Sequence, residues 1–309
     1  MTSNPSAKWC AGFAALVLSA AGAMAALGYA MDCYGLFRDV HGRKIAFHSN
    51  DGTSKYLLSY RYIPANFDGL LVGSSISASW DVSRIDAARV YNASVNGGNI
   101  SDEKVVAENV LSRGRVKLVV FCIHPYLTAS HGQRTGDMKP RAYWGALGSM
   151  QLVKEMGNAL RARLGLAQPL ADENGREIFE PAPEVVARLQ AGPMVGKPIV
   201  IDEIAFEEYG RLVQSARAHG ARVVAFIPPI YASFYEARRK DYDAYFARMA
   251  SLFRPDEKII DFNAPRYAAY TRERSVFYDG SHLTTKAADF FSAELAAALR
   301  GHAESGPPD

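Results

Sequence analysis

The sequence has few of the features that mark nucleic-acid, metal or phosphate sites. No run of five or more Lys or Arg residues occurs, and a net charge of +3 over 309 residues is too small for a nucleic-acid footprint. HExxH, carboxylate clusters, GxGxxG and GxxxxGKS/T are missing, which excludes the usual metal and phosphate motifs. We therefore expect no nucleic-acid partner, no metal and no cofactor.

Cysteine is also scarce. Cys10, Cys33 and Cys122 fit no CxxC or zinc spacing, and no two of them are obvious neighbours. We interpret all three as small apolar residues, so the compartment cannot be read from a disulfide framework.

A long uncharged run opens the chain. Residues 9–31 carry no charge and exceed the roughly 20 residues that a helix needs to cross a bilayer. Residues 1–31 are thus interpreted as a retained membrane anchor or as a signal peptide with a small-residue cleavage site at Ala23-Met24-Ala25; a buried core helix is a third interpretation. The first two both imply export, with the domain periplasmic if anchored and secreted if cleaved.

The remainder alternates short apolar runs with helix-length amphipathic stretches. After a mixed connector at residues 32–66, the domain is expected over residues 67–300, with a variable insertion at about 127–200 and a disordered tail at 301–309. Single helices are expected at 144–164 and at 233–253. The strands are expected at 68–73, 88–93, 116–123, 221–227 and 258–261. This alternation predicts an α/β fold, a three-layer flavodoxin-like sandwich with about five parallel strands.

Polar residues follow several of these strands, where parallel sheets form their sites. Ser75 comes at the tight turn after the first strand, and Asp279 and His282 precede the last helix. A histidine can act as general base for a serine hydroxyl, while an Asp three residues away fixes its tautomer. These residues are the candidate nucleophile, base and orienting carboxylate.

Three motifs stand at ends of the expected strands and helices: Gly73-Ser74-Ser75, Asn92-Ala93-Ser94-Val95-Asn96-Gly97 and Asp279-Gly280-Ser281-His282-Leu283. In combination they resemble blocks one, two and five of the SGNH (GDSL-type) hydrolases. The likeness covers residues 67–299, and the order and separations fit.

The resemblance implies roles for individual residues. Ser75 stands in the nucleophile position of the family's Gly-Asp-Ser block, with Ser74 in place of Asp. Gly97 matches the oxyanion-hole glycine of block two, which acts beside the N–H of Ser75, and Asp279 and His282 match the Asp-x-x-His of block five. No cofactor is implied.

One family block is not matched. Block three normally supplies an oxyanion-hole Asn, whereas the third strand ends here in Ile123-His124-Pro125-Tyr126. Loss of one such donor can cost about 10²–10³ in rate. Another donor replaces it, with His124 the first candidate and Asn96 and Asn99 the others, or the activity is low or absent.

Two hypotheses follow from this resemblance. The Gly-Ser-Ser variant and a single N-terminal anchor are similar to those of extracytoplasmic proteins tied to polysaccharide acylation and lipoteichoic-acid modification. The first hypothesis is a serine esterase or O-acyl (acetyl) transferase that acts on a cell-envelope or exported polysaccharide through an acyl-serine intermediate. The alternative is a catalytically inactive SGNH-like subunit of an envelope polysaccharide assembly complex, with the assembly proteins as its partners.

Overall fold

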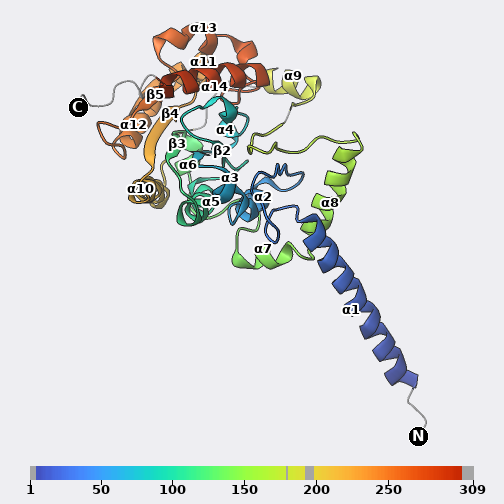
Figure 1. Ribbon diagram of the computed structural model, residues 1–309. Coiled ribbons are helices and arrows are strands. Elements are labelled where there is room, and N and C mark those ends of the chain that lie inside the picture. Colours follow the sequence, from blue (N-terminus) through green and yellow to red (C-terminus); the bar gives the residue numbers. More distant parts are fainter. Residues whose placement is uncertain (1–4, 179, 192–197, 301–309) are drawn as a thin grey trace.

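Five parallel strands form the central sheet of the computed structural model, which describes residues 5–178, 180–191 and 198–300 (Figure 1). Their order is β2-β1-β3-β4-β5, the doubly wound order of flavodoxin-like folds. All strands but the ends of β4 and β5 are buried, as expected for a parallel sheet covered on both faces. The strands are β1 (Gly69–Val72), β2 (Val90–Asn92), β3 (Leu118–Cys122), β4 (Arg222–Ile227) and β5 (Ile259–Asp261).

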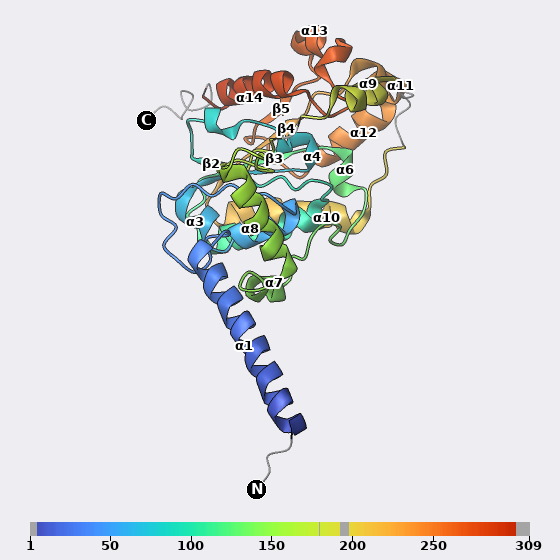
Figure 2. The ribbon, with the colours of Figure 1, turned by 90° about the vertical axis from the view of Figure 1, so that its right-hand side faces the viewer.

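Helices cover both faces of this sheet. Figures 1 and 2 show α14 on one face, and α5 and α10, which pack against each other, on the opposite face. The predicted three-layer α/β/α fold and its five parallel strands are therefore confirmed. The helices are α1 (Pro5–Met31), α2 (Asp51–Leu58), α3 (Tyr62–Asn66), α4 (Ser75–Ala78), α5 (Ile100–Arg113), α6 (Pro125–Thr128), α7 (Pro140–Gly145), α8 (Met150–Arg163), α9 (Pro183–Ala191), α10 (Glu203–Ala218), α11 (Ala232–Ala237), α12 (Arg239–Ala250), α13 (Ala268–Thr271) and α14 (Thr285–Arg300).

Two stretches expected as single helices are each broken into two. The expected helix at 144–164 is wrong because the chain turns after Gly145 and a new helix, α8, begins where the Ser149 side chain accepts a hydrogen bond from the Leu152 N–H. The expected helix at 233–253 is interrupted at Arg238, whose φ of −137° is not helical, and becomes α11 and α12.

Residues 32–66, expected as a connector at the domain edge, contribute substantially to the core. They contain α2 and α3, and the side chains of Tyr34, Phe47, Leu58 and Ile63 are at most 2% exposed. The segment has no clear hydrophobic period because its apolar residues pack from short helices and loops rather than from one regular element.

The helix α1 projects away from the domain (Figures 1 and 2). Its 26 residues from Ser6 to Met31 are long and apolar enough to span a membrane, and its most apolar window is not buried in the protein. The expected tail at 301–309 and part of the variable insertion, at 192–197, lie outside the described residues.

Candidate active site

The candidate nucleophile follows directly from the end of β1. The turn Gly73-Ser74 leads into α4, whose first residue is Ser75. Gly73 is required by close packing, because a Cβ there would overlap the Ser77 hydroxyl oxygen and lie 2.8 Å from Cys122 Cβ. The absence of a side chain lets the turn pass over the end of β3 and present Ser75, which is partly exposed.

The candidate base and its partner lie in a tight turn before α14. The carboxylate of Asp279 accepts hydrogen bonds from the backbone N–H groups of Ser281 and His282, both at 2.8 Å. Arg274 donates to the Asp279 carbonyl at 2.9 Å, and a Cβ at Gly280 would lie 2.8 Å from the Phe234 ring. The turn is thus held by hydrogen bonds within it and by contacts with Arg274 and Phe234 outside it.

The structure brings Ser75, His282 and Asp279 together across 207 residues of sequence. His282 Nε2 lies 2.9 Å from Ser75 Oγ, and His282 Nδ1 lies 2.7 Å from Asp279 Oδ2. Burial raises the pKa of the Asp279 carboxyl, but the hydrogen bonds from His282 and the backbone outweigh it and hold this pKa well below its usual range. An ionised Asp279 requires the proton on His282 Nδ1, which leaves Nε2 free to accept the Ser75 proton.

His124 lies at the end of β3, in the same cavity as Ser75 and His282. Its Nδ1 accepts a hydrogen bond from the Tyr126 N–H at 3.3 Å, so the proton of the neutral ring is on Nε2. Burial, and then the neighbouring charge of His282, lower the pKa of His124 to about 3. Nε2 is buried without a hydrogen-bond partner among the described residues. His124 is thus a neutral donor with an unused N–H.

The loop after β2 runs beside the nucleophile turn, since Ser74 pairs with Val95 in a parallel bridge. Gly97 adopts a left-handed φ of +69°, which favours glycine, and none of the described residues accepts a hydrogen bond from its N–H. The Gly97 carbonyl accepts from the Tyr126 hydroxyl at 3.3 Å. The N–H of Gly97 is therefore available as a donor.

The two other candidate donors are engaged elsewhere. The Asn96 side-chain amide donates to Glu177. The Asn99 amide donates to the carbonyls of Ser130 and Gly132, both at 2.8 Å, while its oxygen caps α5. Of the three candidates for the unmatched block, His124 alone combines an unpartnered donor with a place in the cavity.

A buried ion network, which no sequence motif had indicated, holds the backbone of the loop after β2. The Lys55 ammonium, which is fully buried, donates to the Ser94 carbonyl and pairs with Asp51 at 3.2 Å. Asp51 accepts from the Asn96 N–H at 2.6 Å, and the buried Glu103 accepts from the Val95 N–H at 2.7 Å. The one available signal was the i, i+4 spacing of Asp51 and Lys55 within the supposed connector.

The cavity above the Ser–His pair has a volume of about 660 Å³. Much of its lining is apolar or aromatic, including Ile76, Tyr126, Ile199 and Phe234. Such a cavity suits a mostly apolar group held beside a few polar atoms. No cluster of three or more metal-ligating side chains occurs within the described parts of the chain.

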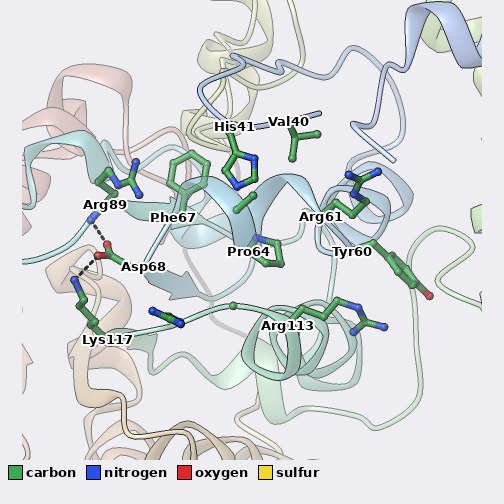
Figure 3. A pocket seen from close by; sticks show the side chains of 13 residues that line it. Val40, His41, Tyr60, Arg61, Pro64, Phe67, Asp68, Arg89, Arg113 and Lys117 are labelled. Carbon is green, nitrogen blue, oxygen red and sulfur yellow. Dashed lines mark hydrogen bonds and ion pairs between the residues drawn. The ribbon is translucent and has the colours of Figure 1, made fainter. Parts of the chain in front are cut away.

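A second cavity of about 610 Å³ lies at the opposite, amino ends of the strands (Figure 3). Its acidic residue Asp68 pairs with Lys117 at 2.9 Å and accepts from the Arg89 N–H at 2.6 Å. The basic side chains in its lining are Arg61, Arg89, Arg113, Arg115 and Lys117. Among its lining residues there is no serine that could pair with a base, whereas Ser75 and His282 both line the first cavity.

Comparison with protein-family models gave no match to this chain. Comparison with curated proteins likewise found no similar protein. The geometry of the site is therefore the basis for assigning a function.

Proposed function

We propose that this protein is an SGNH-type serine esterase or O-acyltransferase. The observation that carries the proposal is the continuous chain of hydrogen bonds from Ser75 through His282 to Asp279, at 2.9 and 2.7 Å. Such a chain recurs in unrelated folds as a device for activating a serine, and it is recognised by geometry rather than by sequence position. The three residues come from opposite ends of the domain and meet at the carboxyl edge of the sheet, where doubly wound folds bind their ligands.

In the first step, Ser75 Oγ attacks the carbonyl carbon of an ester while His282 Nε2 takes its proton. The negative charge passes to the carbonyl oxygen of the tetrahedral intermediate, which the N–H groups of Ser75 and Gly97 and the Nε2–H of His124 stabilise. When the ester C–O bond breaks, His282 returns the proton to the leaving alkoxide. An alcohol departs and an acyl group remains on Ser75.

In the second step, His282 deprotonates the acceptor that attacks the acyl-serine. If the acceptor is water, the product is a carboxylic acid and the protein is an esterase. If it is a sugar hydroxyl, the acyl group moves to the sugar and the protein is a transferase. Asp279 orients His282 in both steps and stabilises its imidazolium form.

We propose a cell-envelope or exported polysaccharide as the ester-bearing or acceptor molecule, with acetyl as the group transferred. The support is the helix α1, which is long and apolar enough to anchor the domain to a membrane. We propose that the domain lies on the extracytoplasmic side of that membrane. This part of the proposal also draws on the resemblance to Gly-Ser-Ser proteins of polysaccharide acylation. Polysaccharide-assembly proteins of the same membrane are the proposed partners.

The test is hydrolysis of p-nitrophenyl acetate and of acetylated polysaccharide by the full chain in detergent. Ser75→Ala should abolish turnover and acyl-enzyme formation. The matched control Ser74→Ala, which removes the neighbouring buried hydroxyl, should retain both. Adding acceptor glycan and following the acetyl group by mass spectrometry separates transferase from esterase.

If wild type and Ser75→Ala are equally inert on both substrates, with and without acceptor, the enzyme proposal is refuted. The non-catalytic subunit of an envelope polysaccharide assembly then takes its place.

A further inference from the structure

The turn between α7 and α8 packs against α1 before that helix ends. Gly28 is buried, and a Cβ on it would lie 2.9 Å from Leu152 Cδ2 and 3.1 Å from the Leu147 carbonyl oxygen. Four residues earlier in α1, Met24 Cγ lies within 3.9 Å of the Cβ position of Gly148. The small residue at position 28 thus lets the turn approach the backbone of the helix.

These contacts define the depth of the turn. With a rise of about 1.5 Å per residue, Gly28 lies roughly 5 Å and Met24 roughly 10 Å before Met31 along the helix. The apolar span from Ser6 to Met31 is about 39 Å long, against a hydrocarbon core of about 30 Å. If α1 crosses a bilayer and its apolar span is centred in it, the hydrocarbon core of the bilayer ends about 5 Å before Met31. This is the position of Gly28, at the level of the α7–α8 turn.

The domain is joined to α1 without a flexible linker. Asp32, the first residue after α1, accepts from the Leu36 N–H at 2.7 Å and pairs with Arg43 at 2.9 Å. Aromatic contacts also connect α1 to α7. The ring centroid of Phe37 lies 6.2 Å from that of Tyr29 in α1 and 5.9 Å from that of Tyr143 in α7. The position of α7 beside α1 is consequently fixed, and Figures 1 and 2 both show α7 below the domain end of the helix.

Two large apolar side chains near the α7–α8 turn are exposed. Trp144 is 69% exposed and Met150 is 72% exposed, although both flank a turn that packs on an apolar helix. Tryptophan is enriched where hydrocarbon meets headgroups, because its ring is apolar and its N–H is polar. Lys139 and Arg141 of the same segment are also exposed, as expected near headgroups.

We infer that the α7–α8 turn, residues 144–150, is a second membrane contact, with Trp144 inserted into the interfacial region of a phospholipid bilayer. The inference rests on the membrane-anchor part of the proposed function and is independent of the chemistry at Ser75. With two contacts, the bilayer would hold the domain at a fixed height and tilt, so that the candidate active site faces substrate at a constant distance from the membrane.

The test is tryptophan fluorescence of the full chain in phospholipid vesicles. The chain has three tryptophans, and subtracting the Trp144→Phe spectrum from the wild-type spectrum isolates Trp144. Lipids brominated near the headgroup end of the acyl chain should remove most of this difference signal, whereas iodide in the aqueous phase should leave it nearly unchanged. Trp80, which is fully buried, and Trp9 of α1 cancel in the subtraction.

A matched control uses the far end of α8. Leu164 is 64% exposed and lies about 20 Å along α8 from Met150, beyond the residues of α8 that contact α1. In the Trp144→Phe background, Leu164→Trp should give a signal that iodide quenches and brominated lipid does not.

Three results would overturn the inference. A Trp144 signal quenched by iodide alone places the turn in water, and one quenched by neither agent means that another protein copy covers it. A chain that fails to float with vesicles removes the anchor itself. Esterase activity, measured separately, is not expected to change in Trp144→Phe, so a failed membrane contact and a failed enzyme proposal give different results.

Discussion

The oxyanion role proposed for His124 gives the sharpest prediction. Its Nε2–H is buried and has no partner among the described residues, and His124 lines the same cavity as Ser75. If this N–H binds the oxyanion, its removal should leave the transition-state charge less stabilised. Loss of one donor in a dry site costs about 10²–10³ in kcat, or roughly 3–4 kcal/mol. We therefore expect His124→Met to lower kcat by this factor with little change in KM.

The matched variant is His124→Gln. The glutamine side chain is similar in shape to methionine but keeps an N–H donor near the position of Nε2. Both variants lose the hydrogen bond from the Tyr126 N–H to the imidazole, a cap worth about 0.5–2 kcal/mol of stability. Any loss of activity through destabilised α6 is thus common to both. His124→Gln should retain kcat within about tenfold of wild type, because the donor remains.

The assay is steady-state hydrolysis of p-nitrophenyl acetate by the full chain, with unfolding of each variant followed by circular dichroism. If the Met and Gln variants keep wild-type kcat while remaining folded, His124 does not bind the oxyanion. Equal losses in both variants would point to the cap, or to packing, as the role of this residue.

Three further predictions concern stability and loop position. Folding lowers the pKa of His124 from 6.5 to about 3, so between these pH values the unfolded chain binds a proton that the folded chain does not. The free energy of unfolding, measured by urea titration, should therefore fall by roughly 3 kcal/mol more in wild type than in His124→Gln between pH 7 and pH 4. Equal losses in the two proteins would contradict this. Gly73→Ala should destabilise by about 1–3 kcal/mol, since its Cβ would meet Cys122; an unchanged thermal midpoint would refute the close packing. Lys55→Met removes the buried ammonium that holds the Ser94 carbonyl. With active sites counted by burst titration, kcat per active site should fall by about tenfold or more, and KM should stay nearly unchanged. A normal kcat per active site would show that Lys55 contributes to folding alone.

The sequence alone determined the sheet and the residues of the candidate chemistry. Apolar runs of β-strand length, such as the one at 116–123, became buried strands because a parallel sheet needs apolar residues on both faces. Ser75, Asp279 and His282 could be named in advance because they stand at strand and helix ends, where the fold leaves side chains free.

Other features depended on contacts between distant segments. The break between α7 and α8 and the burial of residues 32–66 could not be read from local periodicity, because both depend on what packs against them. Lys55 lies in a segment that looked polar and irregular, yet it supports a loop 39 residues away.

The protonation of His124 shows the same division. Its residue type and place at a strand end were visible in the sequence, but only the tertiary structure buries the ring, engages Nδ1 and leaves Nε2–H unpartnered. Sequence specifies which groups are present. Packing decides which of them lose water and keep a free hydrogen-bond donor, because burial and partner geometry are properties of the whole fold.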